Sequence, residues 1–153
     1  MVIGLISDTH SLVRPGVFRA LAGVERILHA GDVGGKTVLD ELAAIAAIEA
    51  VYGNTDPPGD PHLGAAIVVD VDGISIHVSH GHELGSPTPD TLLARYDADV
   101  IVYGHTHKPL VERHGSRLVV NPGAAGPRRF DVKPSVARLT IGDGRADVEL
   151  IWL

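Results

Sequence analysis

The sequence contains no cysteine, which excludes a disulfide framework and the thiolate ligands of the common structural zinc sites. No apolar run approaches the roughly 20 residues that a membrane-spanning helix needs, so we expect no membrane association. The segment Met1–Ser7 lacks the basic flank and small-residue cleavage site of a signal peptide, which leaves the cytoplasm as the default location.

Basic residues are also scarce, with 13 Lys and Arg against 19 Asp and Glu and a net charge of −6. This balance argues against a general nucleic-acid-binding or membrane-surface protein. With 153 residues, of which 44% are hydrophobic, the chain can bury a core, and we expect a single domain over residues 1–153.

The hydropathy pattern predicts an α/β fold. In the first two-thirds, β-rich runs alternate with helical segments, which implies crossover connections and a mixed, largely parallel first sheet. Short strands joined by turns fill the last third and predict a second, mainly antiparallel sheet packed on the first, with helices outside. The expected strands are Val2–Ser7, Ile27–His29, Ile48–Tyr52, Ile74–Ser79, Val100–Tyr103, Leu110–Arg113, Leu118–Asn121, Val136–Ile141 and Val148–Trp152, and the expected helices are Pro15–Leu21, Lys36–Ala47 and Thr91–Tyr96.

Side chains that commonly bind metals follow five of these apolar runs. In chain order the runs end in Asp8-Thr9-His10, Gly31-Asp32, Gly53-Asn54, His80-Gly81-His82 and His105-Thr106-His107. Because ligands of open α/β sheets bind beyond the carboxyl ends of the strands, we expect these groups to meet at one edge. The glycines Gly31, Gly53 and Gly104 would permit the tight turns that aim the next side chains inward.

The mixed oxygen and nitrogen donors suit manganese, iron, nickel, cobalt or zinc better than calcium or magnesium. They are too many for one ion with four or five ligands, and they fit two ions that share a bridging carboxylate. Each motif alone is more often a turn or a helix cap than a metal site, but their joint occurrence favours a metal site. The other histidines have structural explanations: His29 and His77 as hydrogen-bonded core residues, His62 and His114 as surface residues.

A P-loop is the competing explanation of one motif. The segment Ala30–Thr37 follows a strand, precedes a helix and is close to G-x-x-x-x-G-K-[ST], with alanine in the first place. Lys36 would then bind nucleotide phosphates. This alternative places the anionic Asp32 inside the phosphate cradle and leaves the other four motifs unexplained.

Together the motifs resemble the calcineurin-like metallophosphoesterase superfamily, and most closely its small YfcE-type phosphodiesterases, which are related to the retromer scaffold subunit. The matching blocks are SDTH (Ser7–His10), GD (Gly31-Asp32), GN (Gly53-Asn54), SHGH (Ser79–His82), GHTH (Gly104–His107) and NPG (Asn121–Gly123). The resemblance implies a four-layer sandwich in which two β-sheets are flanked by helices.

The resemblance also implies the roles of individual residues. It assigns Asp8, His10 and His107 to one metal ion, Asn54, His80 and His105 to the other, and Asp32 to both as the bridge. His82 lies outside the usual ligand set and is expected close to the substrate or behind the ligands. The expected catalytic residues are Asp32, Asn54, His80 and His82, and the expected substrate-binding residues are Asn54, His82 and Arg129.

The function implied is hydrolysis of a small phosphodiester with two divalent ions, for which manganese is the first candidate. The ions would lower the pKa of a bridging water, and the resulting hydroxide would attack phosphorus in line with the leaving oxygen. The third block reads Gly53-Asn54-Thr55-Asp56, where many phosphomonoesterases of the superfamily carry a histidine in place of Thr55. Since threonine is no general acid near neutral pH, diesters with good leaving groups are favoured.

Three questions stay open at the level of sequence. The first is whether the chain is an enzyme or a binding scaffold with little catalysis, a use of the fold that the retromer relative exemplifies. The second is whether the basic cluster of Arg128, Arg129 and Lys133 is a solvated loop or supplies an arginine to the phosphate. The third is self-association, which exposed C-terminal strand edges and the apolar end Ile151–Leu153 would support.

Overall fold

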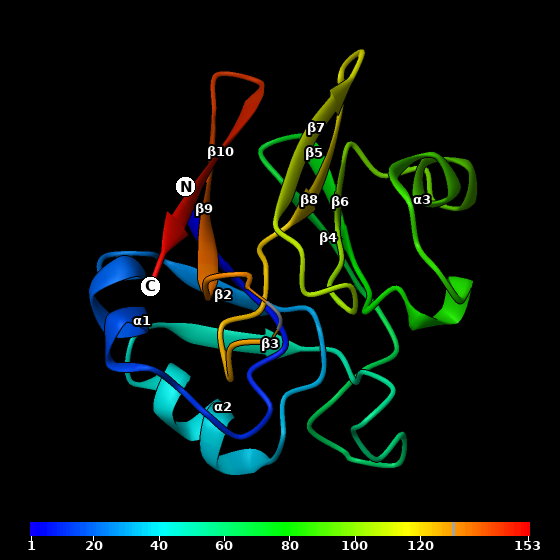
Figure 1. Cartoon of the computed structure of the whole chain (residues 1–153). Coiled ribbons are helices and arrows are strands. Elements are labelled where there is room, and N and C mark those ends of the chain that lie inside the picture. Colours follow the sequence, from blue (N-terminus) through cyan, green and yellow to red (C-terminus); the bar gives the residue numbers. More distant parts are fainter. Residues whose placement is uncertain (130) are drawn as a thin grey trace.

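Two five-stranded β-sheets pack face to face in the computed structural model, which describes residues 1–129 and 131–153 (Figure 1). The first sheet contains β1 (Val2–Ile6), β2 (Arg26–His29), β3 (Ala47–Ala50), β9 (Ser135–Gly142) and β10 (Arg145–Trp152). The second contains β4 (Ile67–Val71), β5 (Ile74–Val78), β6 (Val100–Val102), β7 (Leu110–His114) and β8 (Arg117–Asn121). The predicted sandwich of two β-sheets is confirmed.

Both sheets are mixed. In the first, with strand order β10-β9-β1-β2-β3, the strands β1, β2 and β3 are parallel, and β9 runs antiparallel to both β1 and β10. In the second, with order β4-β5-β6-β8-β7, the central strands β5, β6 and β8 are parallel, and β4 and β7 close the edges as antiparallel hairpin partners.

The prediction of a mainly antiparallel C-terminal sheet is therefore wrong. The last four strands are divided between the sheets: β7 and β8 extend the sheet of β5 and β6, whereas β9 and β10 return to β1. Pairing with β9 makes β1 an interior strand, which suits a strand whose Ile3, Leu5 and Ile6 side chains are fully buried. Hydropathy gives the burial of each strand but not its neighbour, so the assignment to sheets was not readable from chain order.

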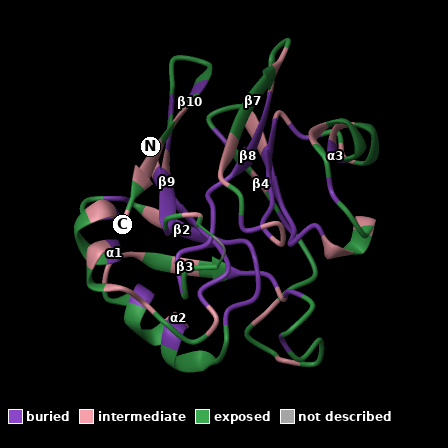
Figure 2. Cartoon of the chain, viewed as in Figure 1, coloured by how far each residue is buried: buried purple, intermediate pink, exposed green. Residues whose placement is uncertain are grey.

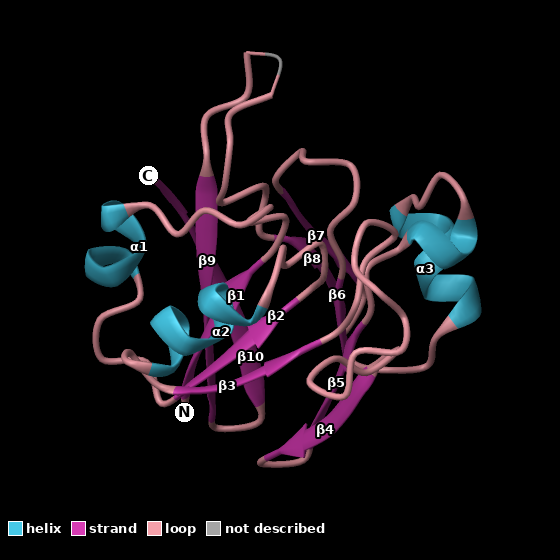
Figure 3. Ribbon diagram, turned by 90° about the horizontal axis from the view of Figure 1, so that it is seen from below, coloured by secondary structure: helices cyan, strands magenta, loops and turns pink. Residues whose placement is uncertain are grey.

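Helices cover the outer faces of both sheets, as expected (Figure 3). The helices α1 (Pro15–Ala20) and α2 (Lys36–Ala43) bury Val17, Val38 and Leu42 against the first sheet. On the other side, α3 (Pro89–Arg95) packs Leu92 on the second sheet, preceded by the short 3-10 helix η1 (His82–Leu84). Among the described residues, no helix is long and apolar enough to cross a membrane.

The largest apolar cluster fills the space between the sheets. Alternation along β1 sends Ile3 and Leu5 into this cluster, while Ile6 faces the helices on the opposite side. Figure 2 shows the buried residues concentrated in the strands and in the loops that follow them. These buried loops leave the carboxyl ends of β1, β2, β3, β5 and β6, and they carry the motifs identified in the sequence.

Candidate metal centre

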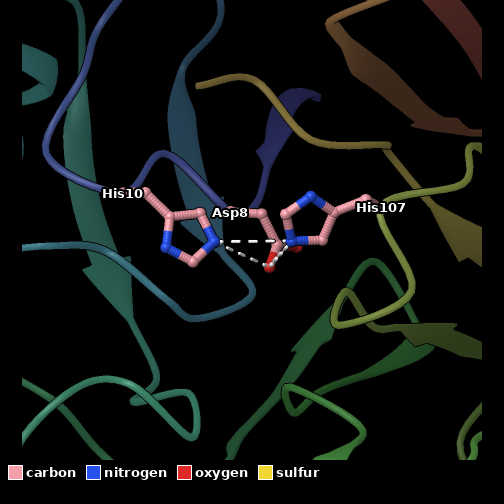
Figure 4. Close-up of side chains that lie close together, drawn as sticks. All are labelled: Asp8, His10 and His107. Carbon is pink, nitrogen blue, oxygen red and sulfur yellow. Dashed lines mark hydrogen bonds and ion pairs between the residues drawn. The ribbon is translucent and has the colours of Figure 1, made fainter. Parts of the chain in front are cut away.

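Loops from both sheets bring the seven sequence-predicted metal ligands to one end of the sandwich. The first group consists of Asp8, His10 and His107, whose ligand atoms lie within 4.8 Å of one another (Figure 4). His107 Nε2 is 3.2 Å and His10 Nε2 is 3.7 Å from Asp8 Oδ1, and the two nitrogens are 3.4 Å apart. These three atoms converge from loops of different sheets.

A second group adjoins the first through Asp32. Its Oδ2 atom lies 3.2 Å from His80 Nε2 and 3.7 Å from His10 Nε2, between the two groups. On the far side, Asn54 Oδ1 lies 3.1 Å from His80 Nε2 and 3.2 Å from His105 Nδ1. One carboxylate oxygen thus faces imidazoles of both groups, as a bridging ligand would.

The donors in this cluster fit a metal cation. Asp8 Oδ1 is buried and has no hydrogen-bond partner among the described residues, while imidazole nitrogens of His10 and His107 face it. A buried carboxylate oxygen without a donor or a cation is costly. Carboxylate, imidazole and amide donors together suit a borderline divalent ion.

Both carboxylates are charged near neutral pH. Burial disfavours the charge of Asp8, but the imidazoles of His10 and His107 that face its carboxylate outweigh burial and hold the pKa of its carboxyl well below the usual range. Burial of Asp32 is likewise outweighed, by His80 and Thr55, and its pKa is also lowered. Burial would lower the pKa of His80, but Asp32 and Asp8 raise it on balance, so protons compete with a cation for His80 Nε2.

The orientation of His80 is fixed from behind. Its Nδ1 atom lies 2.7 Å from the carbonyl oxygen of Ala30, to which the Nδ1–H donates. The Nε2 atom is then the one that faces Asp32. A backbone carbonyl in this position sets the tautomer of a metal-binding histidine and makes the imidazole a better ligand.

The glycines that precede the candidate ligands mainly allow close approach. A Cβ on Gly104 would lie 2.0 Å from Ser7 Oγ and 2.6 Å from Asp8 Oδ2, and one on Gly53 would lie 2.1 Å from Asp32 Oδ1. Neither glycine has a positive φ, so the turn expected there is not what requires glycine. Only Gly31, with φ of 99°, matches that expectation.

Left-handed backbone conformations concentrate in the same loops. They occur at Asp8 (φ 53°), His10 (44°), Asp32 (53°), His105 (69°) and His107 (61°). This conformation costs a non-glycine residue roughly 1–2 kcal/mol, and such strain persists where surrounding contacts impose it, commonly at functional sites. Backbone hydrogen bonds from Asp8 to Gly31 and from His10 to Asp32, both 3.0 Å, supply such contacts.

Asp56 is a central residue of the site that the sequence analysis gave no role. Its buried carboxylate accepts hydrogen bonds from the backbone N–H groups of Val33 (3.0 Å), Gly34 (3.1 Å) and Gly53 (2.9 Å). It therefore ties the loop after β2 to the loop after β3. The only signal in the sequence is its place two residues after Asn54, since its partners are backbone groups.

These hydrogen bonds also argue against a P-loop. The N–H groups of Val33 and Gly34, which a phosphate-binding loop would offer to its ligand, already donate to Asp56. Lys36 forms an exposed ion pair with Asp40 at 2.9 Å on the surface of α2. The segment Ala30–Thr37 therefore holds Asp32 in place and does not form a phosphate-binding loop.

His29 and His77 are hydrogen-bonded residues of the sheets, as predicted. His29 Nδ1 accepts the Gly31 N–H (3.1 Å), so Nε2 carries the proton and donates to Thr9 Oγ1 at 3.0 Å. The Thr9 hydroxyl donates in turn to the Val33 carbonyl at 2.7 Å. His77 Nε2 lies 3.1 Å from a serine hydroxyl, that of Ser79.

We expect His29 to make the stability of the metal-free protein depend on pH. Burial lowers the pKa of His29 to about 4 from an ordinary value of 6.5. Below pH 6.5 the imidazole of His29 binds a proton in the unfolded chain but not in the folded chain. The contribution of His29 to the free energy of unfolding therefore falls by about 3 kcal/mol between pH 6.5 and 4. Urea unfolding of the wild type and His29→Gln at several pH values measures this.

The difference between the two proteins isolates His29 from the other titrating groups. The variant is expected to be less stable at pH 7.5 but to lose less stability on acidification, whereas the exposed control His62→Gln keeps the wild-type slope. Equal pH slopes for wild type and His29→Gln would show that His29 does not carry this dependence.

The residues expected at the substrate lie at different places. His82 is half-buried in η1, with its ring centroid 5.4 Å from that of His80 and 6.4 Å from that of His105. Arg129 is exposed on the loop between β8 and β9, and within the described residues its side chain forms no hydrogen bond or ion pair with the candidate ligands. Asn121, from the NPG block, donates to the Gly104 carbonyl at 3.1 Å and so supports the loop of His105 and His107.

Comparison with known proteins identifies the family. Residues 1–144 match the family model described as the calcineurin-like phosphoesterase superfamily domain. The chain belongs to this superfamily. The resemblance read from the motifs is confirmed.

Relatives within the superfamily include named phosphodiesterases. A probable metallophosphoesterase of Methanothermobacter thermautotrophicus is 36% identical over 162 residues, 99% of this chain and 92% of that protein. A phosphodiesterase of Methanocaldococcus jannaschii is 30% identical over 141 residues, which are 80% of this chain and 83% of that protein. The phosphodiesterase YfcE of Escherichia coli is 43% identical over 49 residues, 32% of this chain and 25% of that protein.

The fold is also that of Vps29, a protein named for vacuolar protein sorting. The crystal structure of Vps29 from Entamoeba histolytica complexed with Zn²⁺ superposes with a TM-score of 0.80 at 26% identity, covering 99% of both chains. The superfamily fold thus accompanies proteins named as phosphodiesterases and a protein named for vacuolar sorting.

Proposed function

We propose that this protein is a phosphodiesterase that uses two divalent metal ions, with manganese as the first candidate. The observation that supports this most is the position of Asp32 Oδ2 between His10 and His80, beside Asp8 Oδ1, which has no hydrogen-bond partner in the described part of the chain. A cluster of two carboxylates, four imidazoles and one amide exceeds what one ion of four or five ligands needs. The names of the relatives agree with this reaction class.

In this proposal Asp8, His10 and His107 hold one ion, Asn54, His80 and His105 hold the other, and Asp32 contributes to both. The bound ions would supply Lewis-acid activation of a water and of the phosphate. The two carboxylates neutralise only half of the charge of two dications, because the imidazoles and the amide are neutral. The site therefore keeps a net positive charge for a phosphodiester anion.

The residues around the cluster favour a small diester. Asn54 is exposed and His105 is partly exposed, so a substrate reaches this side of the cluster from solvent. The Thr55 hydroxyl donates to Asp32 and is no proton donor for a leaving group. Leaving groups that depart without a proton, such as nitrophenolate, are favoured for this reason. His82 and Arg129 are proposed to contact the substrate.

A binding scaffold with little catalysis is the second candidate, because Vps29 of Entamoeba histolytica shares the fold. A scaffold has no need of strained ligand loops or of an unpaired buried carboxylate oxygen, and these features favour the enzyme. Self-association through β10 and a location in the cytoplasm stay predictions.

Hydrolysis of bis-p-nitrophenyl phosphate by metal-stripped protein tests the proposed function. We expect no activity without metal, recovery with manganese, and much slower hydrolysis of the monoester p-nitrophenyl phosphate. Variants His82→Gln and Arg129→Gln are expected to raise KM more than they lower kcat. Two bound ions without turnover of any diester would favour the scaffold, and failure to bind metal at all would contradict both the ligand assignment and the reaction.

A further inference from the structure

Thr55 holds one oxygen of Asp32 with two hydrogen bonds. Its backbone N–H donates to Asp32 Oδ1 at 2.9 Å and its hydroxyl donates to the same oxygen at 2.7 Å. Asp32 is only 3% exposed, so water has little access to replace either donor. The backbone of Gly53 closes this side further, since a Cβ there would lie 2.1 Å from Oδ1.

The other oxygen of Asp32 is left for cations. Oδ2 faces His80 Nε2 at 3.2 Å and His10 Nε2 at 3.7 Å, whereas the backbone N–H of Thr55 donates to Oδ1. A free carboxylate can bind metals through either oxygen or both. In this chain Oδ1 already accepts two donors, so the carboxylate can neither turn nor open a second ligand position at low cost.

We propose that Thr55 is a positioning residue that confines Asp32 to a bridge through the single oxygen Oδ2. This inference rests on the proposed two-metal site. A bridge through one oxygen brings two ions closer together than a bridge through both, so Thr55 sets their spacing and the affinity of the second ion. The N–H donor is present for any residue except proline at position 55, but a hydroxyl in this place requires threonine or serine.

Substitutions at position 55 separate the hydroxyl from the backbone donor. Thr55→Val removes the hydroxyl with little change of shape, and Thr55→Ser keeps it. Partners that orient metal ligands typically contribute about 10–100-fold in metal affinity. We therefore expect Thr55→Val to lower the affinity for the second Mn²⁺ ion by at least about tenfold, and Thr55→Ser to retain the wild-type affinity.

The test is titration of metal-free protein with Mn²⁺, followed by calorimetry and by electron paramagnetic resonance of the loaded protein. The resonance reports exchange coupling between two manganese ions, which a loosened bridge changes and a merely structural role leaves alone. Thr140→Val, on the exposed side of β9, is the matched control. Melting temperatures of the metal-free variants show whether position 55 affects folding.

The outcomes distinguish this inference from the proposed function. The role of the hydroxyl is supported if Thr55→Val binds the second ion more weakly and shows an altered exchange coupling, while Thr55→Ser has wild-type affinity and coupling. Wild-type affinity and coupling in Thr55→Val overturn it, as does a Thr55→Ser protein that behaves like Thr55→Val. A wild-type protein that binds fewer than two ions contradicts the two-metal site itself.

Discussion

Replacing Asp32 with asparagine is expected to slow phosphodiester hydrolysis severely and to remove at least one bound ion. The amide keeps the shape of the carboxylate but has a single oxygen. Both Thr55 donors require an oxygen at the Oδ1 position, so the amide NH₂ is directed to the Oδ2 position, between His10 and His80. An NH₂ group cannot bind a cation. We expect kcat/KM to fall by about 1,000-fold, equivalent to ~4 kcal/mol at 1.36 kcal/mol per tenfold.

The measurement combines elemental analysis of bound manganese with the kinetics of bis-p-nitrophenyl phosphate hydrolysis. Asp40→Asn is the control, because Asp40 is an exposed aspartate of α2 whose partner is Lys36. It is expected to keep both ions and full activity. An Asp32→Asn protein with wild-type activity and two bound ions would contradict the assignment of Asp32 as the bridge.

Replacing Asp56 with alanine is expected to produce the largest loss of stability. The substitution leaves the N–H groups of Val33, Gly34 and Gly53 without their acceptor in a buried or partly buried place. Losing charged hydrogen bonds of this kind costs about 3 kcal/mol in the free energy of unfolding. For a chain of this length that loss lowers the melting temperature by about 10 °C.

Thermal and urea unfolding of metal-free protein measure this loss. Asp40→Ala is the matched control, since an exposed ion pair contributes at most about 1 kcal/mol. Asp56→Ala is also expected to bind manganese more weakly, because it unties the loop of Asp32 from the loop of Asn54. Equal stability of the two variants would show that Asp56 is not the link between these loops.

The sequence predicts which groups meet because parallel strands share a carboxyl edge. Asp8, Asp32 and Asn54 follow β1, β2 and β3, which are parallel, so their convergence follows from strand order alone. The placement of His80 and His107 follows from the same rule applied to β5 and β6 in the other sheet. The rule does not tell that these strands belong to two sheets: the hydropathy pattern predicts all five runs in the first sheet, whereas β5 and β6 lie in the second.

Pairing that depends on distant partners could not be predicted. β9 lies beside β1 although more than 120 residues separate the two strands, and no local pattern encodes that choice. The strand β4 has no counterpart among the predicted strands, although its apolar run Ile67–Val71 precedes Asp72-Gly73, a typical hairpin turn. The helix α2 ends at Ala43 and not at Ala47, because Ala47 pairs with Arg26 as the first residue of β3.

The supporting hydrogen bonds were equally hidden from the sequence. Ser7 donates to Asp8 Oδ2 at 2.6 Å, and Thr55 and Asp56 bind groups in the preceding loop. Serine, threonine and aspartate are common after strands for the sake of turns alone, so residue type does not reveal such partners. Motifs identify the candidate ligands, whereas the hydrogen bonds that orient these ligands are seen only in the structure.

Anomalous diffraction from crystals of the manganese-loaded protein tests the central claim most directly. We predict two manganese peaks about 3.5–4 Å apart, since that is the usual spacing of two-metal sites. One peak is expected among Asp8, His10 and His107, and the other among Asn54, His80 and His105, with Asp32 Oδ2 between them. A single peak, or peaks away from these residues, would contradict the two-metal centre.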